Sequence, residues 1–393
     1  KKGKEMNIDE YINATRTISN RTPNSLLYTT YYQVIKQAFG LGVTLPEIKI
    51  VYSLQKSTEV VELDDGTFLL YDQYLGQAMN MFNRILLNST DRFDSVMYLY
   101  KLLAEEFITR GQSIPALIFA LSYQDFKHQQ DSYKNDKDKI QRGIYTSSQE
   151  LFIIAHELAH LIIDKPSNFL TILDIMNINE SPKLRYTNLI KTIGNYFGIN
   201  NVTYQVLDDP TIAGANPIKT TLESLEISTT IRDECCCDII ATIIVVAVLR
   251  NIFPVQYQED ILIAVAMGLR HLRVIGFIKD MCSGAIMSPE LHLTDAIDSK
   301  VIIDYLTRTS NIRTFLHRNS QKLGIKDNAK WREKLIDLAE HYEFIIDDPL
   351  YEAAGRATSM TLKDMKENFP KSAEIPDVAV VVQDVGEITG FYE

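Results

Sequence analysis

Residues 147–166 read SSQELFIIAHELAHLIIDKP and hold two histidines four apart, His156 and His160, with Glu157 directly after the first. In an α-helix, positions i and i+4 lie on the same face, about 6 Å apart along the axis. The two imidazoles can therefore bind one metal ion together, as zinc sites require. A carboxylate beside them can act as general base on a metal-activated water. The pattern predicts a hydrolytic metal centre.

The alternative is an ordinary buried helix whose two histidines are core or capping residues. Burying two imidazoles and a carboxylate among apolar residues costs free energy unless those groups have partners. A dry environment also strengthens the electrostatic field of a metal ion. We therefore favour the metal site. The surrounding residues of the stretch are apolar: Phe152, Ile153, Ile154, Leu158, Leu161, Ile162 and Ile163.

A catalytic zinc needs a third protein ligand and one open position. We predict Glu234, in the stretch RDECCCDIIATIIV, as that ligand. Asp238 lies four residues later on the same helical face and could accept the Nδ1–H of one histidine, which fixes its tautomer. The alternative is an exposed acidic helix start, where Asp233 and Glu234 only favour the helix dipole.

Other acids and thiols remain candidate ligands. Asp164 follows His160 by four residues, although a capping role near the helix end is the alternative. The cysteines at 235–237 are interpreted as small buried thiols packing near the ligands, because a fourth protein ligand would close the site. Three further acids are weaker candidates: Glu180, Glu223 and Glu226.

The combination of motifs resembles a known group, the gluzincin metallopeptidases. The later motif, Glu-Cys-Cys-Cys-Asp from Glu234 to Asp238, is similar to the Glu-x-x-Ala-Asp of the prenyl-protein protease and its heat-shock membrane relatives, and to the soluble phage-exclusion peptidase type. Cysteine stands at the small position. The resemblance implies His156, His160 and Glu234 as zinc ligands and Glu157 as general base.

The resemblance also implies a His, Tyr or Arg downstream of the glutamate ligand that stabilises the oxyanion of the tetrahedral intermediate. His292, in MSPELHLTDAIDS, is our candidate, and a surface histidine after a turn at Pro289 is the alternative. In zincin folds an edge strand beside the motif helix binds the substrate backbone, and chain order favours residues 67–71. The rivals of His292 are His271, Arg270 and Arg273.

Most of the elements that must position these residues are expected to be helices. The motif helix should begin at a capping box formed by Ser147 and Glu150 and end at Pro166. A strand at 47–53 and a hairpin at 58–73, with its turn at Asp65-Gly66, should form a small sheet. Further helices are expected at 11–40, 74–87, 93–109, 115–126, 167–198, 222–250, 258–279, 298–308 and 328–344.

The predicted fold class is α+β and predominantly helical: a zincin-like catalytic core with a small antiparallel or mixed sheet and the HExxH helix. We divide the chain into an N-terminal helical segment (1–45), the metallopeptidase core (46–300), a C-terminal helical region (301–369) and an extended tail (370–393). The tail could occupy the substrate groove.

Composition limits the partners. The 393 residues carry a net charge of −11, so there is no basic surplus for a nucleic acid. Three of the four cysteines are consecutive, and neighbours in sequence rarely form disulfides with each other, so we expect no disulfide framework. The apolar runs at 239–249 and 261–269 are short of the ~20 residues of a membrane span. We expect a cytoplasmic protein that takes a protein or peptide substrate; the oligomeric state stays open.

The predicted function is a zinc-dependent endopeptidase that hydrolyses peptide bonds with Glu157 as general base. A metal-binding regulatory or interaction protein with a retained but weakly active site is the alternative. A helical structural protein without metal, and a selective protease whose cleft is filled until a partner arrives, are further alternatives.

Overall fold

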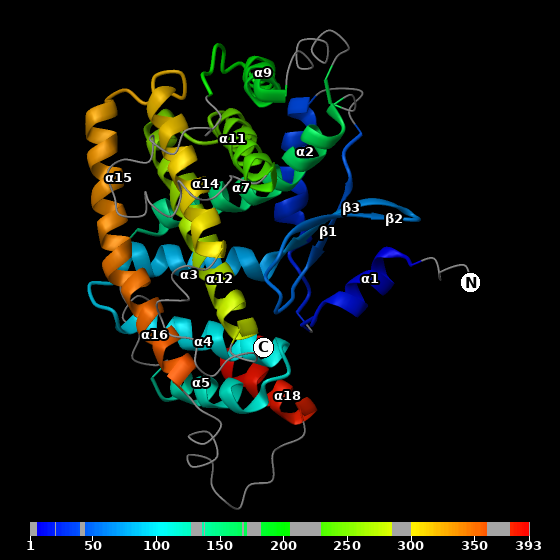
Figure 1. The fold of residues 1–393 in the computed structure, drawn as a ribbon, viewed down its shortest axis with the longest axis vertical. Helices are drawn as coiled ribbons and strands as arrows, with labels where there is room; N and C mark the ends of the chain where they lie inside the picture. Colours follow the sequence, from blue (N-terminus) through cyan, green and yellow to red (C-terminus); the bar gives the residue numbers. More distant parts are fainter. Residues whose placement is uncertain are drawn as a thin grey trace, which may run out of the picture.

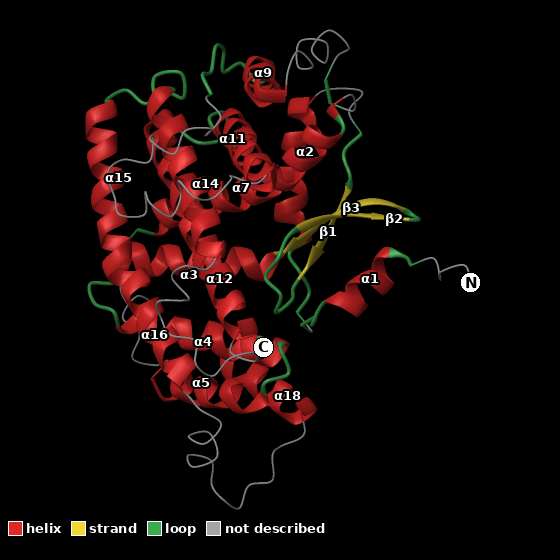
Figure 2. Ribbon diagram, in the orientation of Figure 1, coloured by secondary structure: helices red, strands yellow, loops and turns green. Residues whose placement is uncertain are grey.

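The chain is predominantly helical with one small mixed sheet, in agreement with the predicted class (Figures 1 and 2). The computed structural model describes residues 6–19, 21–39, 44–126, 136, 138–166, 169–170, 182–204, 229–284, 300–359 and 378–392.

The sheet has the strand order β1-β3-β2, with β1 at Glu47–Val51, β2 at Glu59–Leu63 and β3 at Gly66–Asp72. The hairpin of β2 and β3 was predicted, and Gly66, at φ +147°, begins the return strand. The expectation that residues 67–71 form an edge is wrong, because β1 pairs with β3 in parallel on its other side. The edge strand that contacts the motif helix is β2.

Alternating residues of the sheet face two different layers, as the period of two in a strand requires. Helix α1 (Ile8–Thr15) covers one face and buries Ile8 against Val51, Val61, Phe68 and Leu70. On the opposite face, the intervening side chains of β3, Leu69 and Tyr71, join the main core.

The main core is built around α7 (Lys139–Asp164) and α11 (Thr229–Leu249), which pack against each other. Apart from Thr242, helix α11 is apolar on every side along 239–249 because α7, α9 (Pro182–Tyr196), α12 (Gln258–Gly284) and α14 (Lys300–Arg318) surround it. Figure 1 shows α12 running past α7 toward the lower helices. The remaining helices are α2 (Ser25–Phe39), α3 (Gln73–Asn88), α4 (Phe93–Thr109), α5 (Ser113–Phe126), η4 (Val255–Tyr257), α15 (Asn328–Tyr342), the π-helical η5 (Glu343–Asp347), α16 (Asp348–Ser359) and α18 (Val378–Thr389).

The motif helix begins earlier than the sequence indicated. Helix α7 starts at Lys139, so the predicted capping box at Ser147 and Glu150 is wrong. Both side chains bind tyrosines instead: Ser147 accepts from Tyr31, and Glu150 accepts from Tyr28 and Tyr71. The residues from Lys139 to Thr146 belong to the same helix, and Arg142 near its start pairs with Asp136.

The predicted extended tail is a helix over most of its described length. Helix α18 packs on α4 and α5, at the lower end of the molecule in Figure 1. Its valine-rich sequence suggested a strand, but Val381 and Val385 are buried at helical spacing. Ser19 donates to the carbonyl of Phe391 at 2.7 Å, which joins the tail to the segment after α1. Within the described residues, the tail makes its main helix contacts with α4 and α5 and not with the helices that carry His156 and Glu234.

One helix of the described chain, Val255–Ser283, has the length and apolar composition of a membrane span. Of its most apolar window, 78% is buried inside the molecule. Such burial is also found in core helices, so length and composition are weak evidence for a membrane here.

Candidate metal centre

The histidines of α7 and the glutamate of α11 face one another across the contact between these helices. The Nε2 atoms of His156 and His160 lie 3.2 Å apart. One oxygen of Glu234, Oε2, lies 3.2 Å from His156 Nε2, and the other, Oε1, lies 3.4 Å from His160 Nε2. The structure thus brings together the three residues that helical spacing had selected, and this cluster could hold a metal ion.

The second nitrogen of each imidazole points away from the cluster. His156 Nδ1 lies 2.9 Å from Asp238 Oδ1, and His160 Nδ1 lies 3.4 Å from Cys237 Sγ. Asp238 is therefore placed where the sequence analysis expected it. With hydrogen on each Nδ1, both Nε2 lone pairs and the Glu234 carboxylate point at one another. Such a group of acceptors repels itself unless a proton or a cation lies between them, so the donor set fits a metal ion.

Arg308, on α14, is the member of the cluster that sequence reasoning missed. Its Nε and Nη2 donate to the two oxygens of Asp238 at 2.8 and 2.7 Å, and its Nη1 lies 2.9 Å from Glu234 Oε2. One feature of the sequence could have indicated its role: Arg308 is a charged residue on an otherwise apolar helix face, between Tyr305 and the buried Ile312 at helical spacing. The cluster therefore extends across the domain boundary predicted at residue 300.

Charge pairing fixes the protonation of these groups. Burial opposes the charged form of His156, but hydrogen bonds to Asp238 and Glu234 outweigh it and raise its pKa to about 9. Burial likewise disfavours the Asp238 carboxylate, yet the Arg308 charge lowers its pKa. The pKa of Glu234 is also lowered, because its hydrogen bond to His156 and the charge of Arg308 overcome burial. These shifts all favour a positive charge between the two carboxylates.

Glu157 lies next to the cluster without joining it. Its side chain is half-buried, and burial raises its pKa to about 7, against the charge of His156. Within the described part of the chain, no side chain donates a hydrogen bond to this carboxylate. It can therefore accept a proton near neutral pH, as a general base must.

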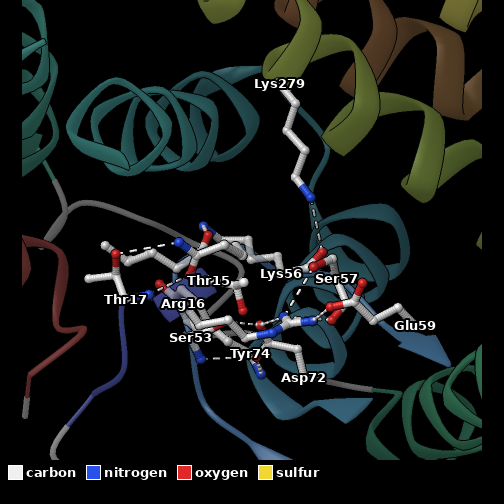
Figure 3. A network of polar contacts seen from close by, with 12 residues as sticks. Thr15, Arg16, Thr17, Ser53, Lys56, Ser57, Glu59, Asp72, Tyr74 and Lys279 are labelled. Carbon is white, nitrogen blue, oxygen red and sulfur yellow. Dashed lines mark hydrogen bonds and ion pairs between the residues drawn. The ribbon is translucent and has the colours of Figure 1, made fainter. Parts of the chain in front are cut away.

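A buried polar network fixes the edge strand β2 beside this site (Figure 3). Arg16 pairs with Glu59 of β2 at 2.7 Å, donates to the carbonyl of Ser57 at 2.9 Å and lies 3.5 Å from the buried Asp72. The negative charge of Glu59 contributes to the raised pKa of Glu157, so the start of β2 lies close to the site. The segment after α1 thus holds the edge strand in position.

The rival candidates lie elsewhere. His271 is buried between Tyr342 and Asn83, at 3.0 Å from each, and burial lowers its pKa to about 3. Arg270 and Arg273 pair with Asp347. Asp164 is exposed at the end of α7. His292, Glu180, Glu223 and Glu226 lie outside the described residues.

The three consecutive cysteines are buried thiols. Cys235, Cys236 and Cys237 all have a raised thiol pKa because burial disfavours the thiolate. A neutral thiol at Cys237 can accept the Nδ1–H of His160 without adding a charge to the cluster. The packing role predicted for these residues agrees with their positions.

Comparisons with known proteins found no relative: no protein-family model, no curated protein and no solved structure matches this chain.

Proposed function

We propose that this chain is a zinc-dependent endopeptidase of gluzincin type with a zincin-like core. The observation that carries the proposal is the triangle of three side chains, His156, His160 and Glu234. Their two Nε2 atoms lie 3.2 Å apart, Glu234 Oε2 lies 3.2 Å from His156 Nε2, and the other oxygen, Oε1, lies 3.4 Å from His160 Nε2. Tetrahedral zinc with bonds of ~2.0–2.1 Å holds its ligand atoms ~3.3 Å apart. Two histidines and one glutamate are also a ligand set of catalytic zinc that leaves one position open.

The residues around the triangle supply the rest of the mechanism. Zinc bound there would polarise the peptide carbonyl and acidify a water molecule. Glu157 takes the proton of the attacking water and delivers it to the leaving amine nitrogen. Asp238 and Cys237 keep the two imidazoles oriented through their Nδ1 atoms. An extended substrate segment would add to the edge of β2, the strand that contacts α7.

A cytoplasmic location and a protein or peptide substrate are part of the proposal. All four cysteines are free and buried, which favours a reducing compartment. The acidic net charge of −11 disfavours a nucleic acid as partner.

The variant Glu157→Gln tests this function. It keeps the size of the side chain and removes the proton acceptor, so we expect peptide cleavage to fall by ~10²-fold or more while zinc content stays at one ion per chain. Asp164→Asn is the matched control, because Asp164 is an exposed acid on the same helix and its variant should cut like the wild type.

Two results would contradict the proposal in different ways. A purified wild-type protein that binds no zinc excludes the metal centre. A protein that binds zinc but cleaves no member of a diverse peptide library supports the alternative, a regulatory or interaction protein with a retained site.

A further inference from the structure

We propose that Arg308 is a positioning residue of the metal centre, which holds the carboxylates of Glu234 and Asp238 in the orientation that faces the two imidazoles. The inference rests on the proposed function, since it concerns the same ligands. It assigns a defined role to a residue of α14, an element that carries no part of either sequence motif.

The guanidinium of Arg308 engages both carboxylates at once. Its Nη1 is 2.9 Å from Glu234 Oε2, while Nε and Nη2 donate to the two oxygens of Asp238. The side chain is only 10% exposed and stacks 5.1 Å from the centre of the Tyr305 ring. Its planar fork is thus fixed from several sides, a geometry that the single ammonium of a lysine cannot reproduce.

This contact holds the carboxylate of Glu234 between the arginine and the two imidazoles. Oε2 lies 2.9 Å from Arg308 Nη1 and 3.2 Å from His156 Nε2, while Oε1 lies 3.4 Å from His160 Nε2. Loss of the guanidinium would therefore free Glu234 to turn away from the two Nε2 atoms.

The same guanidinium also orients the first histidine. Asp238 Oδ1 accepts from Arg308 and lies 2.9 Å from His156 Nδ1, so the chain of contacts runs from Arg308 through Asp238 to a ligand imidazole. Partners that orient metal ligands typically contribute ~10–100-fold to metal affinity. Arg308 therefore supports two of the three ligands.

Arg308→Lys tests the inference, with Arg273→Lys as the matched control. Arg273 is also a largely buried arginine paired with an acid, Asp347, but it lies outside the metal-ligand cluster. We expect Arg308→Lys to bind zinc ~10–100-fold more weakly in a chelator competition. In the cobalt(II)-substituted protein, the visible absorption should change, because Glu234 is no longer held in its orientation. Arg273→Lys should change neither readout.

The inference is overturned if Arg308→Lys keeps both the zinc affinity and the cobalt spectrum of the wild type. A wild type that binds neither metal would instead remove the proposed function. If the variant does not fold, a measurement on the wild type still tests the inference. NMR can follow the hydrogen-bonded guanidinium NH signals of Arg308, and these signals should persist when zinc is added. Their loss on zinc addition would show that the arginine releases Glu234, against the inference.

Discussion

The Nδ1 atoms of His156 and His160 have different partners, although both residues present Nε2 to the cluster. His156 is bound through a buried carboxylate, Asp238, whereas His160 meets a neutral thiol, Cys237. The pKa of His160 is lowered by burial and by the charge of His156, while that of His156 is raised. Glu234 contacts both imidazoles and so determines whether they act as one site.

Replacing Glu234 should separate ligation from folding. We expect Glu234→Gln to weaken zinc binding by ~100-fold or more, because an amide is a poor zinc ligand. Asp233→Asn is the control: the adjacent carboxylate accepts a hydrogen bond from Tyr186 and does not belong to the ligand set. Chelator competition measures both variants, and equal affinity of the two would exclude Glu234 as a ligand.

The sequence could predict five members of the site because each lies at a helical spacing from another: His156, Glu157, His160, Glu234 and Asp238. It could not predict Arg308. A single arginine on a distant helix has no fixed spacing to its partners, and only the packing of α14 on α11 brings it to Asp238.

At the scale of elements, a second buried acid joins the motif helix to its neighbours. Glu150 of α7 accepts hydrogen bonds from Tyr28 of α2 and Tyr71 of β3, at 2.8 and 3.1 Å. Gly76 of α3 leaves the space for this carboxylate, since a Cβ there would lie 1.9 Å from its Oε1. Burial raises the pKa of Glu150 to about 7, although both tyrosines favour the charged form.

This shift predicts a pH dependence of stability. The folded-state pKa of about 7 exceeds the ordinary 4.5, so the fold favours the protonated form. The free energy of unfolding should therefore fall as pH rises from about 4.5 to 7, by about 3 kcal/mol in total. We expect Glu150→Gln to make this fall smaller by about that amount, as measured by denaturant unfolding of the metal-free protein at pH 5 and 8. The part of the fall that remains belongs to Glu157 and His156, whose pKa values are also raised.

The control for this pH dependence is Glu333→Gln, on the exposed face of α15. It should keep the pH dependence of the wild type. If Glu150→Gln keeps it as well, Glu150 is not the group that titrates.

Helices and the hairpin were predictable because their periodicity and turn residues are local signals. Two errors came from non-local contacts. The parallel pairing of β1 with β3 made β3 the central strand, and burial of Val381 and Val385 on α4 and α5 made a helix of a valine-rich segment. The sequence of each segment does not show which distant segment it will pack against.

At the scale of the whole molecule, the two ends of the described chain form one packed corner. Phe391 is fully buried, with its ring 5.6 Å from that of Tyr52 and 5.3 Å from that of Tyr74. Arg21 donates to the carbonyl of Gly390 at 2.9 Å. The C-terminal segment therefore has a structural role in this corner.

Removing the buried ring of Phe391 should lower the stability of the fold and leave the proposed metal centre intact. We expect Phe391→Ala to reduce the free energy of unfolding by about 3–5 kcal/mol, while the folded fraction keeps its zinc affinity. Ile336→Ala, at a residue that is 41% exposed, is the control and should change stability little. A gain of peptidase activity in Phe391→Ala would contradict this structural role. It would instead support the hypothesis that the tail inhibits the enzyme.

The cluster joins three helices far apart in the chain: α7 brings both histidines, α11 both acids and α14 the arginine. During synthesis, a nascent chain that ends before residue 300 has every proposed ligand but not Arg308. A growing polypeptide should therefore acquire metal with full affinity only once α14 has left the ribosome.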